Sequence, residues 1–359
     1  MNSMKKTMLI VMISMASVAL SSCVNAVYCT SATGACYFHF TTGAAQNSAI
    51  GYTTHPLDSG NGNIVRAVIV IHGTDRTAGH YFETMAGVAN SHKLLDKVII
   101  VAPHFICAQD KPAAGDLYWT CENWKDGGPA VNDASVYSFT VIDKLVEKLR
   151  SSFPNLTSVV ITGHSAGGQF VQRYAASNNI DVIGSGFSVK YIPANPSSYM
   201  YLDERRLKKS AVCVDETDCV LTLDSFEKPY WNADSSAECG KYNRYKYGLD
   251  DREGYYIGPL TSEQIVTQYV GRDVVYLLGN KDNSKDSEYS ELDKSCPGDA
   301  EGPYMGPDAH PFRLQRGLAF HAYMTGIFSA GHVLQIVPGC MHDEVCMYQS
   351  NAAFSVIFQ

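Results

Sequence analysis

Ser165, at the centre of Gly163-His164-Ser165-Ala166-Gly167, is the residue with the clearest capacity for chemistry. The pattern G-x-S-x-G is typical of a sharp strand-to-helix turn that exposes a serine and tolerates only small neighbours. Here the pentapeptide follows a β-branched run, residues 158–162, and precedes residues with helical spacing. This context predicts a nucleophilic serine, whereas the pattern without it would equally suit an ordinary glycine-rich turn.

A serine hydroxyl is a poor nucleophile at neutral pH, so it needs a base, and the base needs an orienting acid. In the strand-turn-helix arrangement of G-x-S-x-G the chain order is serine, acid, histidine. The acid is expected just past the next-to-last strand, where Asp282 lies three residues beyond Gly279. Asp286 is the rival candidate.

The base is expected after the last strand, and Pro338-Gly339-Cys340-Met341-His342 provides a histidine there. His342 is late in the chain and follows an apolar run. His321 and His332 are expected within a helix and a strand as structural residues. His342 is therefore the predicted base, and a surface histidine without function is the alternative.

The tetrahedral intermediate of acyl transfer needs two N–H donors, one after the nucleophile and one in the loop after an early strand. Ala166 and Thr74 occupy those positions. Nearby, Arg76 has two possible roles: to bind a substrate carboxylate, or to hold its own loop through Asp75. We favour the structural role.

The elements that must position these residues follow from six apolar runs that alternate with helical stretches. The runs are residues 64–71, 97–102, 158–162, 188–193, 272–278 and 332–337. Apolar residues recur at helical spacing between two of the runs and again after Ser165: Ile142, Leu145, Val146, Leu149, then Phe170, Val171, Tyr174. This alternation predicts an α/β fold with a mostly parallel, doubly wound sheet.

Two segments interrupt the alternation, residues 106–134 and a tyrosine-rich insertion at about 199–262. Neither has an apolar period of its own, so we expect loops or a cap over the sheet and no second domain. The tyrosines suit either a surface for sugars or aryl groups or a cap that packs on itself.

The order of the motifs IHGTDR, GHSAGG, GNKD and PGCMH resembles the α/β-hydrolase superfamily over residues 64 to 350. This resemblance implies Ser165 as nucleophile, Asp282 as acid and His342 as base. More narrowly, the chain resembles a group of secreted, mostly uncharacterised fungal and bacterial hydrolases, which implies no substrate. The matching segments are WKDGG (124–128), GHSAGGQFVQRYA (163–175), ANPSSY (194–199), YKYGL (245–249) and Cys296-Pro297, whereas residues 302–317 depart from the pattern.

Composition excludes other classes. The 359 residues carry a formal charge of -8 and no basic block, which argues against nucleic-acid binding. The sequence contains neither the C-x-x-C nor the H-E-x-x-H spacing that would indicate a zinc site. The acidic stretch 282–301 lacks the spacing of a calcium loop. We expect no metal and no cofactor.

Residues 1–26 have the character of a secretory signal, with two lysines before a 13-residue apolar stretch too short to span a membrane. Cys23 ends a lipobox-like sequence, while Val24-Asn25-Ala26 fits ordinary cleavage, so both a lipid anchor and a free mature protein remain open. Residues 27–63 form a cysteine-containing leader, and residues 64–359 the hydrolase domain.

Ten cysteines remain after Cys23, an even number that suits disulfides in an oxidising compartment. Four pairs are favoured because their cysteines lie close together in the sequence, and the two remaining cysteines make a fifth pair. The expected pairs are Cys29–Cys36, Cys107–Cys121, Cys213–Cys219, Cys340–Cys346 and Cys239–Cys296.

Together these features predict an exported serine hydrolase, secreted, periplasmic or lipid-anchored, that cleaves carboxylic esters through an acyl-enzyme. The substrate would be a small or polymer-borne ester, and the lack of a long apolar lid helix favours short to medium acyl chains. One alternative is an acyltransferase with the same residues. The other is a non-catalytic binding protein on a hydrolase scaffold.

Overall fold

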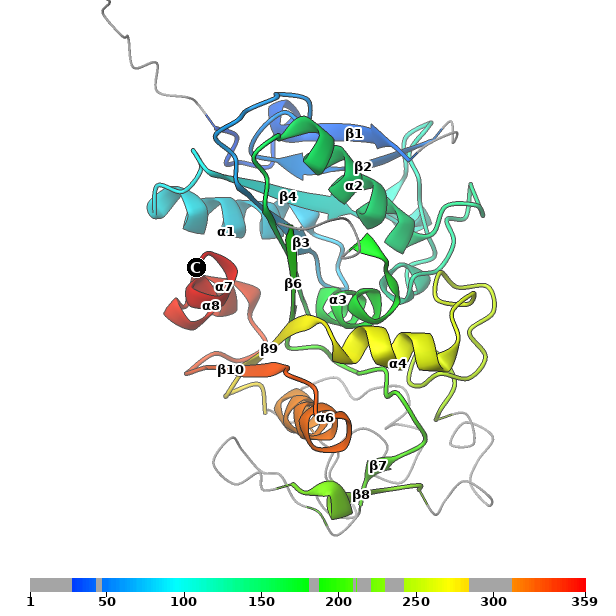
Figure 1. Cartoon of the computed structure of the whole chain (residues 1–359). Coiled ribbons are helices and arrows are strands. Elements are labelled where there is room, and N and C mark those ends of the chain that lie inside the picture. The colour runs from blue at the N-terminus through cyan, green and yellow to red at the C-terminus, as the bar shows by residue number, and fades with distance from the viewer. Residues whose placement is uncertain are drawn as a thin grey trace, which may run out of the picture.

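A central eight-stranded sheet organises the molecule in the computed structural model, which describes residues 28–42, 47–180, 187–208, 211, 221–229, 242–283 and 312–359. The strand order is β1-β2-β4-β3-β5-β6-β9-β10 (Figure 1). The strands are β1 (Tyr37–Thr41), β2 (Ser48–Thr53), β3 (Arg66–Ile71), β4 (Val98–His104), β5 (Ser158–His164), β6 (Ser188–Ala194), β9 (Asp273–Gly279) and β10 (Val333–Val337).

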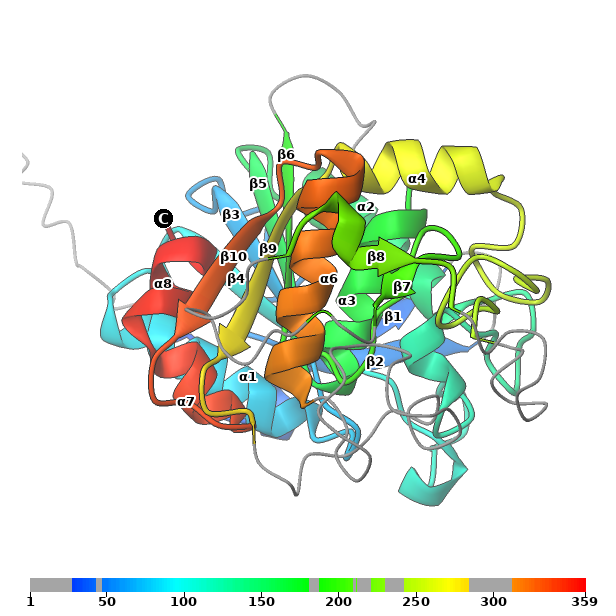
Figure 2. The same ribbon diagram turned by 90° about the horizontal axis from the view of Figure 1, so that it is seen from below.

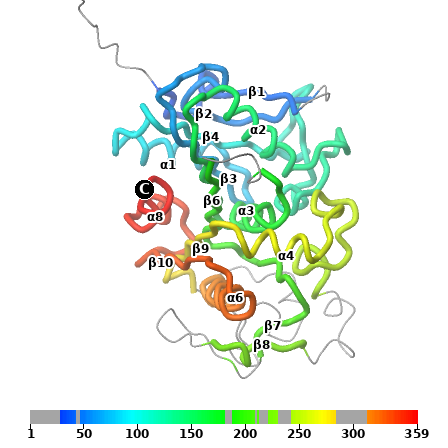
Figure 3. Tube along the Cα trace, viewed as in Figure 1, coloured from blue at the N-terminus to red at the C-terminus, as the bar shows by residue number. Residues whose placement is uncertain are grey.

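The six apolar runs of the sequence correspond to strands β3, β4, β5, β6, β9 and β10, which pair in parallel. Strands β1 and β2 both lie in the leader, where no strand was predicted. They are antiparallel to each other, and β2 is antiparallel to β4, so they extend the same sheet at its amino-terminal edge (Figure 3). The fold is thus a mostly parallel α/β sheet, as predicted.

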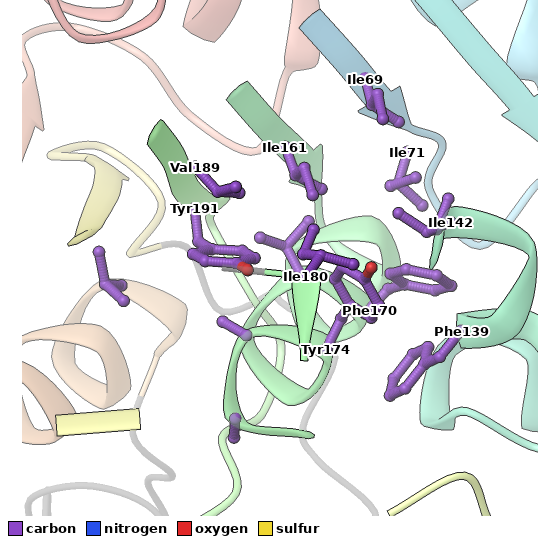
Figure 4. Packing of buried hydrophobic residues seen from close by; sticks show 14 of the residues in the cluster. Ile69, Ile71, Phe139, Ile142, Ile161, Phe170, Tyr174, Ile180, Val189 and Tyr191 are labelled. Atoms are coloured by element: carbon purple, nitrogen blue, oxygen red, sulfur yellow. The ribbon is translucent and has the colours of Figure 1, made fainter. Parts of the chain in front are cut away.

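Alternation along each strand decides which side chains meet which helices. In β3, Ala67, Ile69 and Ile71 join one apolar cluster, whereas Val68 and Val70 join the other. The first cluster packs Ile161 of β5 against Phe170 and Tyr174, the residues that the helical spacing had placed on the sheet (Figure 4). Both faces of the sheet are therefore covered by apolar side chains.

Helices α1 (Ala78–Ser91), α7 (Glu344–Gln349) and α8 (Asn351–Ile357) cover one face, and α2 (Ser138–Ser152), α3 (Ala166–Ser177) and α6 (Arg313–Phe328) cover the other. Helix α4 (Ser262–Val270) packs on α3. Figure 2 shows α8 and α6 on opposite sides of β9 and β10. No helix among the described residues is long and apolar enough to cross a membrane.

The described parts of the two insertions pack onto this framework. Trp119 and Trp124 are buried beside the disulfide Cys107–Cys121. The short strands β7 (Arg206–Leu207) and β8 (Phe226–Glu227) pair with each other, and their apolar residues join the cluster that contains α3. Tyr199, Tyr201 and Tyr242 are also buried, which favours the packing role for these three tyrosines.

The motifs WKDGG and YKYGL, far apart in sequence, meet at α3. Arg173 of α3 is fully buried, and its guanidinium lies 3.0 Å from the Asp126 carboxylate. Its Nε donates to the Lys246 carbonyl at 3.2 Å, and the Lys246 ammonium lies 3.9 Å from Asp126. A buried charge is costly unless it is paired, so this group of three charged residues fixes both insertions against the helix.

Candidate active site

Ser165 lies in the sharp turn between β5 and α3, with φ 59° and ψ -118°. Such a conformation is sparsely populated for a residue with a side chain, and it persists only where the surroundings enforce it. A Cβ on Gly167 would lie 2.3 Å from the Ile71 carbonyl oxygen, and one on Gly163 would lie 2.5 Å from the Gly167 carbonyl oxygen. The flanking glycines are therefore required by close backbone packing, and the serine stays partly exposed.

Asp282 follows β9 and His342 follows β10, and the two side chains meet. The Nδ1–H of His342 donates to Oδ2 of Asp282 at 2.7 Å. Asp282 is buried, whereas the imidazole is 27% exposed. In the neutral imidazole this bond places the ring proton on Nδ1, so Nε2 is the nitrogen that can accept a proton.

The loops that carry these two residues are joined directly. The Lys281 N–H donates to the Cys340 carbonyl at 2.9 Å, and the Gly339 N–H donates to Oδ1 of Asn280 at 2.8 Å. The expected disulfide Cys340–Cys346 is present and spans His342. Hydrogen bonds thus join the acid loop to the base loop, and the disulfide closes the base loop itself.

His342 also reaches the serine turn. Its ring centroid lies 4.5 Å from that of His164, the residue before Ser165. Within the described residues no hydrogen bond joins Ser165 Oγ to His342. Such bonds are often long without substrate and shorten in the reacting complex. The structure therefore brings all three predicted residues to one edge of the sheet and joins two of them by a hydrogen bond.

The two predicted N–H donors lie at the same edge. Ala166 is the first residue of α3, so its N–H has no acceptor within the helix. Thr74 is exposed in the loop after β3. The Gly73 carbonyl, which shares a peptide with the Thr74 N–H, accepts from Nδ1 of His72 at 2.9 Å and from the Arg76 N–H at 3.1 Å. The orientation of that peptide is thereby fixed.

Arg76 has the structural role that we favoured, but with a different partner. Its Nε donates to Oδ2 of Asp110 at 2.6 Å, and its Nη1 donates to the Thr74 carbonyl at 2.9 Å. The expected partner was Asp75. Asp110 lies 34 residues away and reaches Arg76 only through the fold, so adjacency in sequence was misleading.

Sequence reasoning missed Arg313, which is buried at the start of α6 with Nη1 3.6 Å from Oδ1 of Asp282. Its Nε donates to Ser197 Oγ at 3.0 Å. A single arginine has no spacing signal, so only the fold reveals it. Burial, with the nearby His342 and Arg313, holds the pKa of His164 well below its usual value, so His164 is neutral.

Several sequence predictions fall partly or wholly outside the described residues: Asp286, the pairs Cys213–Cys219 and Cys239–Cys296, and most of the acidic stretch 282–301. Cys29–Cys36, Cys107–Cys121 and Cys340–Cys346 are paired as expected. His332 is structural, since it contacts the Tyr276 hydroxyl and the Tyr269 carbonyl. Among the described residues, no group of histidine, cysteine and carboxylate side chains is arranged to hold a metal.

Solved structures identify the fold. A poly(3-hydroxybutyrate) depolymerase from Bordetella parapertussis superposes with a TM-score of 0.55 and 20% identity, over 87% of this chain and 85% of that one. A poly(aspartic acid) hydrolase from Sphingomonas sp. KT-1 superposes with a TM-score of 0.56 and 19% identity, over 90% and 98% of the two chains. No protein-family model and no curated protein sequence matches the chain. The chain has the α/β-hydrolase fold.

Proposed function

We propose that the protein is an exported serine hydrolase that cleaves carboxylic esters through an acyl-enzyme. The observation that carries this proposal is the convergence of three chain segments at one sheet edge. Ser165 occupies the strained turn after β5, and the His342–Asp282 hydrogen bond lies beside it. A serine, an imidazole and a buried carboxylate in this relation suit nucleophilic acyl transfer.

In the first half-reaction, Ser165 Oγ attacks the ester carbonyl carbon while Nε2 of His342 takes the hydroxyl proton. The C–O bond to the alcohol then breaks, and His342 returns that proton to the departing alkoxide. Asp282 stabilises the transient imidazolium through the 2.7 Å bond at Nδ1. The product bound to the protein is an ester of Ser165.

In the second half-reaction, water attacks the acyl carbon and gives its proton to His342, which returns it to Ser165 Oγ as the carboxylic acid leaves. In both halves a negative oxygen develops on the former carbonyl. The N–H groups of Thr74 and Ala166 are the proposed donors to it. Removal of one such donor costs about 10² to 10³ in kcat in a comparable site.

The substrate class rests on comparison and on chemistry. The two structural neighbours are named for a polymeric ester and for poly(aspartic acid), a polyamide. These names support keeping polymer-borne esters, as well as small ones, among the proposed substrates. Transfer to an alcohol other than water would use the same residues, and added alcohols that divert product from the acid to a new ester would reveal it.

Export is part of the proposal. It is supported by the signal-like residues 1–26 and by the three disulfides among the described residues. Disulfides persist in oxidising compartments and are rare in the cytosol. The exported protein would be either attached to a membrane through a lipid on Cys23 or released as a free mature protein.

The test is hydrolysis of p-nitrophenyl esters from acetate to palmitate, with acetylated sugars, feruloyl esters, poly(3-hydroxybutyrate) and poly(aspartic acid) alongside. We expect turnover of short to medium esters by the purified protein and none by Ser165→Ala. Folded wild-type protein that hydrolyses no ester faster than Ser165→Ala would favour a non-catalytic binding protein.

A further inference from the structure

Asn195 is the first residue after β6, in the motif ANPSSY that the proposed mechanism does not use. It is 1% exposed and has φ 42°, in the left-handed region that few residues other than glycine adopt. Asparagine is one of those few, because its short polar side chain can bond locally. Its own N–H donates to the Leu277 carbonyl of β9 at 3.0 Å. The backbone at Asn195 is therefore held in an unusual conformation between two strands.

The side chain of Asn195 contacts all three segments that carry the proposed catalytic residues. Oδ1 accepts from the Gly279 N–H, at the end of the acid strand, at 2.8 Å. Nδ2 donates to the Met341 carbonyl, next to the base, at 3.3 Å. Nδ2 also lies 3.4 Å from Nε2 of His164, next to the nucleophile.

The contact with His164 continues to a fourth segment, the loop after β3 that carries Thr74. Nδ1 of His164 lies 3.4 Å from the Tyr81 hydroxyl. That hydroxyl packs against Gly73, since a Cβ there would be 2.7 Å from it. Asn195, His164 and Tyr81 thus form a buried polar chain from the acid and base loops to the loop of Thr74.

We propose that Asn195 is a positioning residue that holds the acid loop, the base loop and the nucleophile turn in register. This inference rests on the proposed function. A neutral primary amide suits the position because it supplies one acceptor and two donors at once. A carboxylate would lack the donors, and a hydroxyl could not span three partners.

The expected effect is on the chemical step. Catalytic groups misplaced by about 1 Å can lose a hundredfold in rate. Loss of the amide frees the Met341 carbonyl beside His342 and the Gly279 N–H before Asp282. The imidazole then samples orientations in which Nε2 no longer faces Ser165. Asn195 is buried and does not itself reach a bound substrate, so substrate binding should change little.

The experiment compares Asn195→Gly with Asn178→Ala. Glycine adopts the left-handed backbone readily and removes the side chain with its amide. Asn178 is a matched control, a fully buried asparagine at the other end of α3 whose side chain bonds the Ile180 N–H and the Tyr191 hydroxyl. Asn195→Asp, which keeps the shape and the acceptor, serves if the glycine variant does not fold.

We expect Asn195→Gly to lower kcat between tenfold and a hundredfold with KM within about twofold. We also expect it to weaken or shift the low-field proton resonance of the His342 Nδ1–H, assigned by its loss in His342→Gln. Asn178→Ala should lower Tm but leave kcat and the His342 Nδ1–H resonance unchanged. A folded Asn195 variant with wild-type kcat and an unchanged resonance would overturn the positioning role. Wild-type protein without esterase activity would instead overturn the proposed function.

Discussion

At the residue scale, the proposed chemistry depends on the negative charge of the Asp282 carboxylate at Nδ1 of His342. The change Asp282→Asn preserves size but removes that charge and offers a donor where an acceptor is needed, so the imidazole adopts the wrong tautomer. We predict a fall in kcat of about 10⁴, as in a comparable triad. Steady-state kinetics on a p-nitrophenyl ester would measure it.

Asp286→Asn is the matched control for this prediction, because Asp286 was the rival acid four residues further on. We predict nearly unchanged kcat. If Asp286→Asn were the inactive variant and Asp282→Asn the active one, the assignment of the acid would be wrong despite the hydrogen bond in the structure.

The sequence singled out Ser165, Asp282 and His342 as candidates because each follows an apolar run, and the ends of parallel strands meet at one edge. It did not locate Asn195 or Arg313 in the site, because neither type has a spacing rule and both act through contacts made only in the fold. For the same reason Asp110, rather than its neighbour Asp75, is the partner of Arg76.

At the element scale, the disulfide Cys340–Cys346 encloses His342 between β10 and α7. The cross-link closes a short loop, so its entropic contribution to stability is modest, about 2 kcal/mol. Its larger effect should be on placement of the imidazole. We predict that the double substitution Cys340→Ser with Cys346→Ser lowers kcat at least tenfold while Tm falls by only a few degrees.

Kinetics and calorimetry on the double serine variant would check this prediction. Peptide mapping should show both cysteines in one linked fragment of the wild type. A double variant with wild-type kcat would mean that packing and the bond from Lys281 to Cys340 hold the loop without the disulfide.

Strands β3, β4, β5, β6 and β9 were predictable because they are largely buried and each contains a run of apolar residues. Strand β10 lies at the sheet edge and is only partly buried, but its sequence keeps an apolar run. Strands β1 and β2 were not predictable, since they lie at the sheet edge and contain polar residues and glycine in short segments. Their pairing depends on contact with β4, which no local pattern encodes.

At the scale of the whole molecule, buried histidines couple stability to pH. Burial lowers the pKa of His72 to about 3 and of His332 to about 4, so both stay neutral in the folded state. In the unfolded chain each binds a proton below its usual pKa of about 6.5. The stability that these neutral histidines contribute is therefore present at pH 7 and is lost as pH falls below about 6.5.

We predict that each of these two histidines removes about 1 kcal/mol from the free energy of unfolding between pH 7 and pH 5.5. Urea unfolding at the two pH values would measure it. His332→Gln should reduce this pH-dependent loss of unfolding free energy by about 1 kcal/mol. Equal pH dependence in wild type and variant would show that His332 does not contribute.

Localisation is also a property of the whole molecule. If Cys23 is lipidated, the mature protein partitions with membranes and incorporates labelled palmitate, and Cys23→Ser abolishes both. A soluble mature protein that begins at Val27 would exclude the lipid form. Neither result changes the chemistry proposed for Ser165.

The central claim is that Ser165 is a nucleophile activated by its surroundings, and covalent labelling tests it most directly. A fluorophosphonate probe reacts with such a serine and spares the many ordinary ones. Mass spectrometry of the digested protein should show one equivalent of probe on the peptide that carries Ser165, with labelling lost in Ser165→Ala and strongly slowed in His342→Gln. Folded wild-type protein that takes up no probe, or takes it up on another residue, would contradict the account.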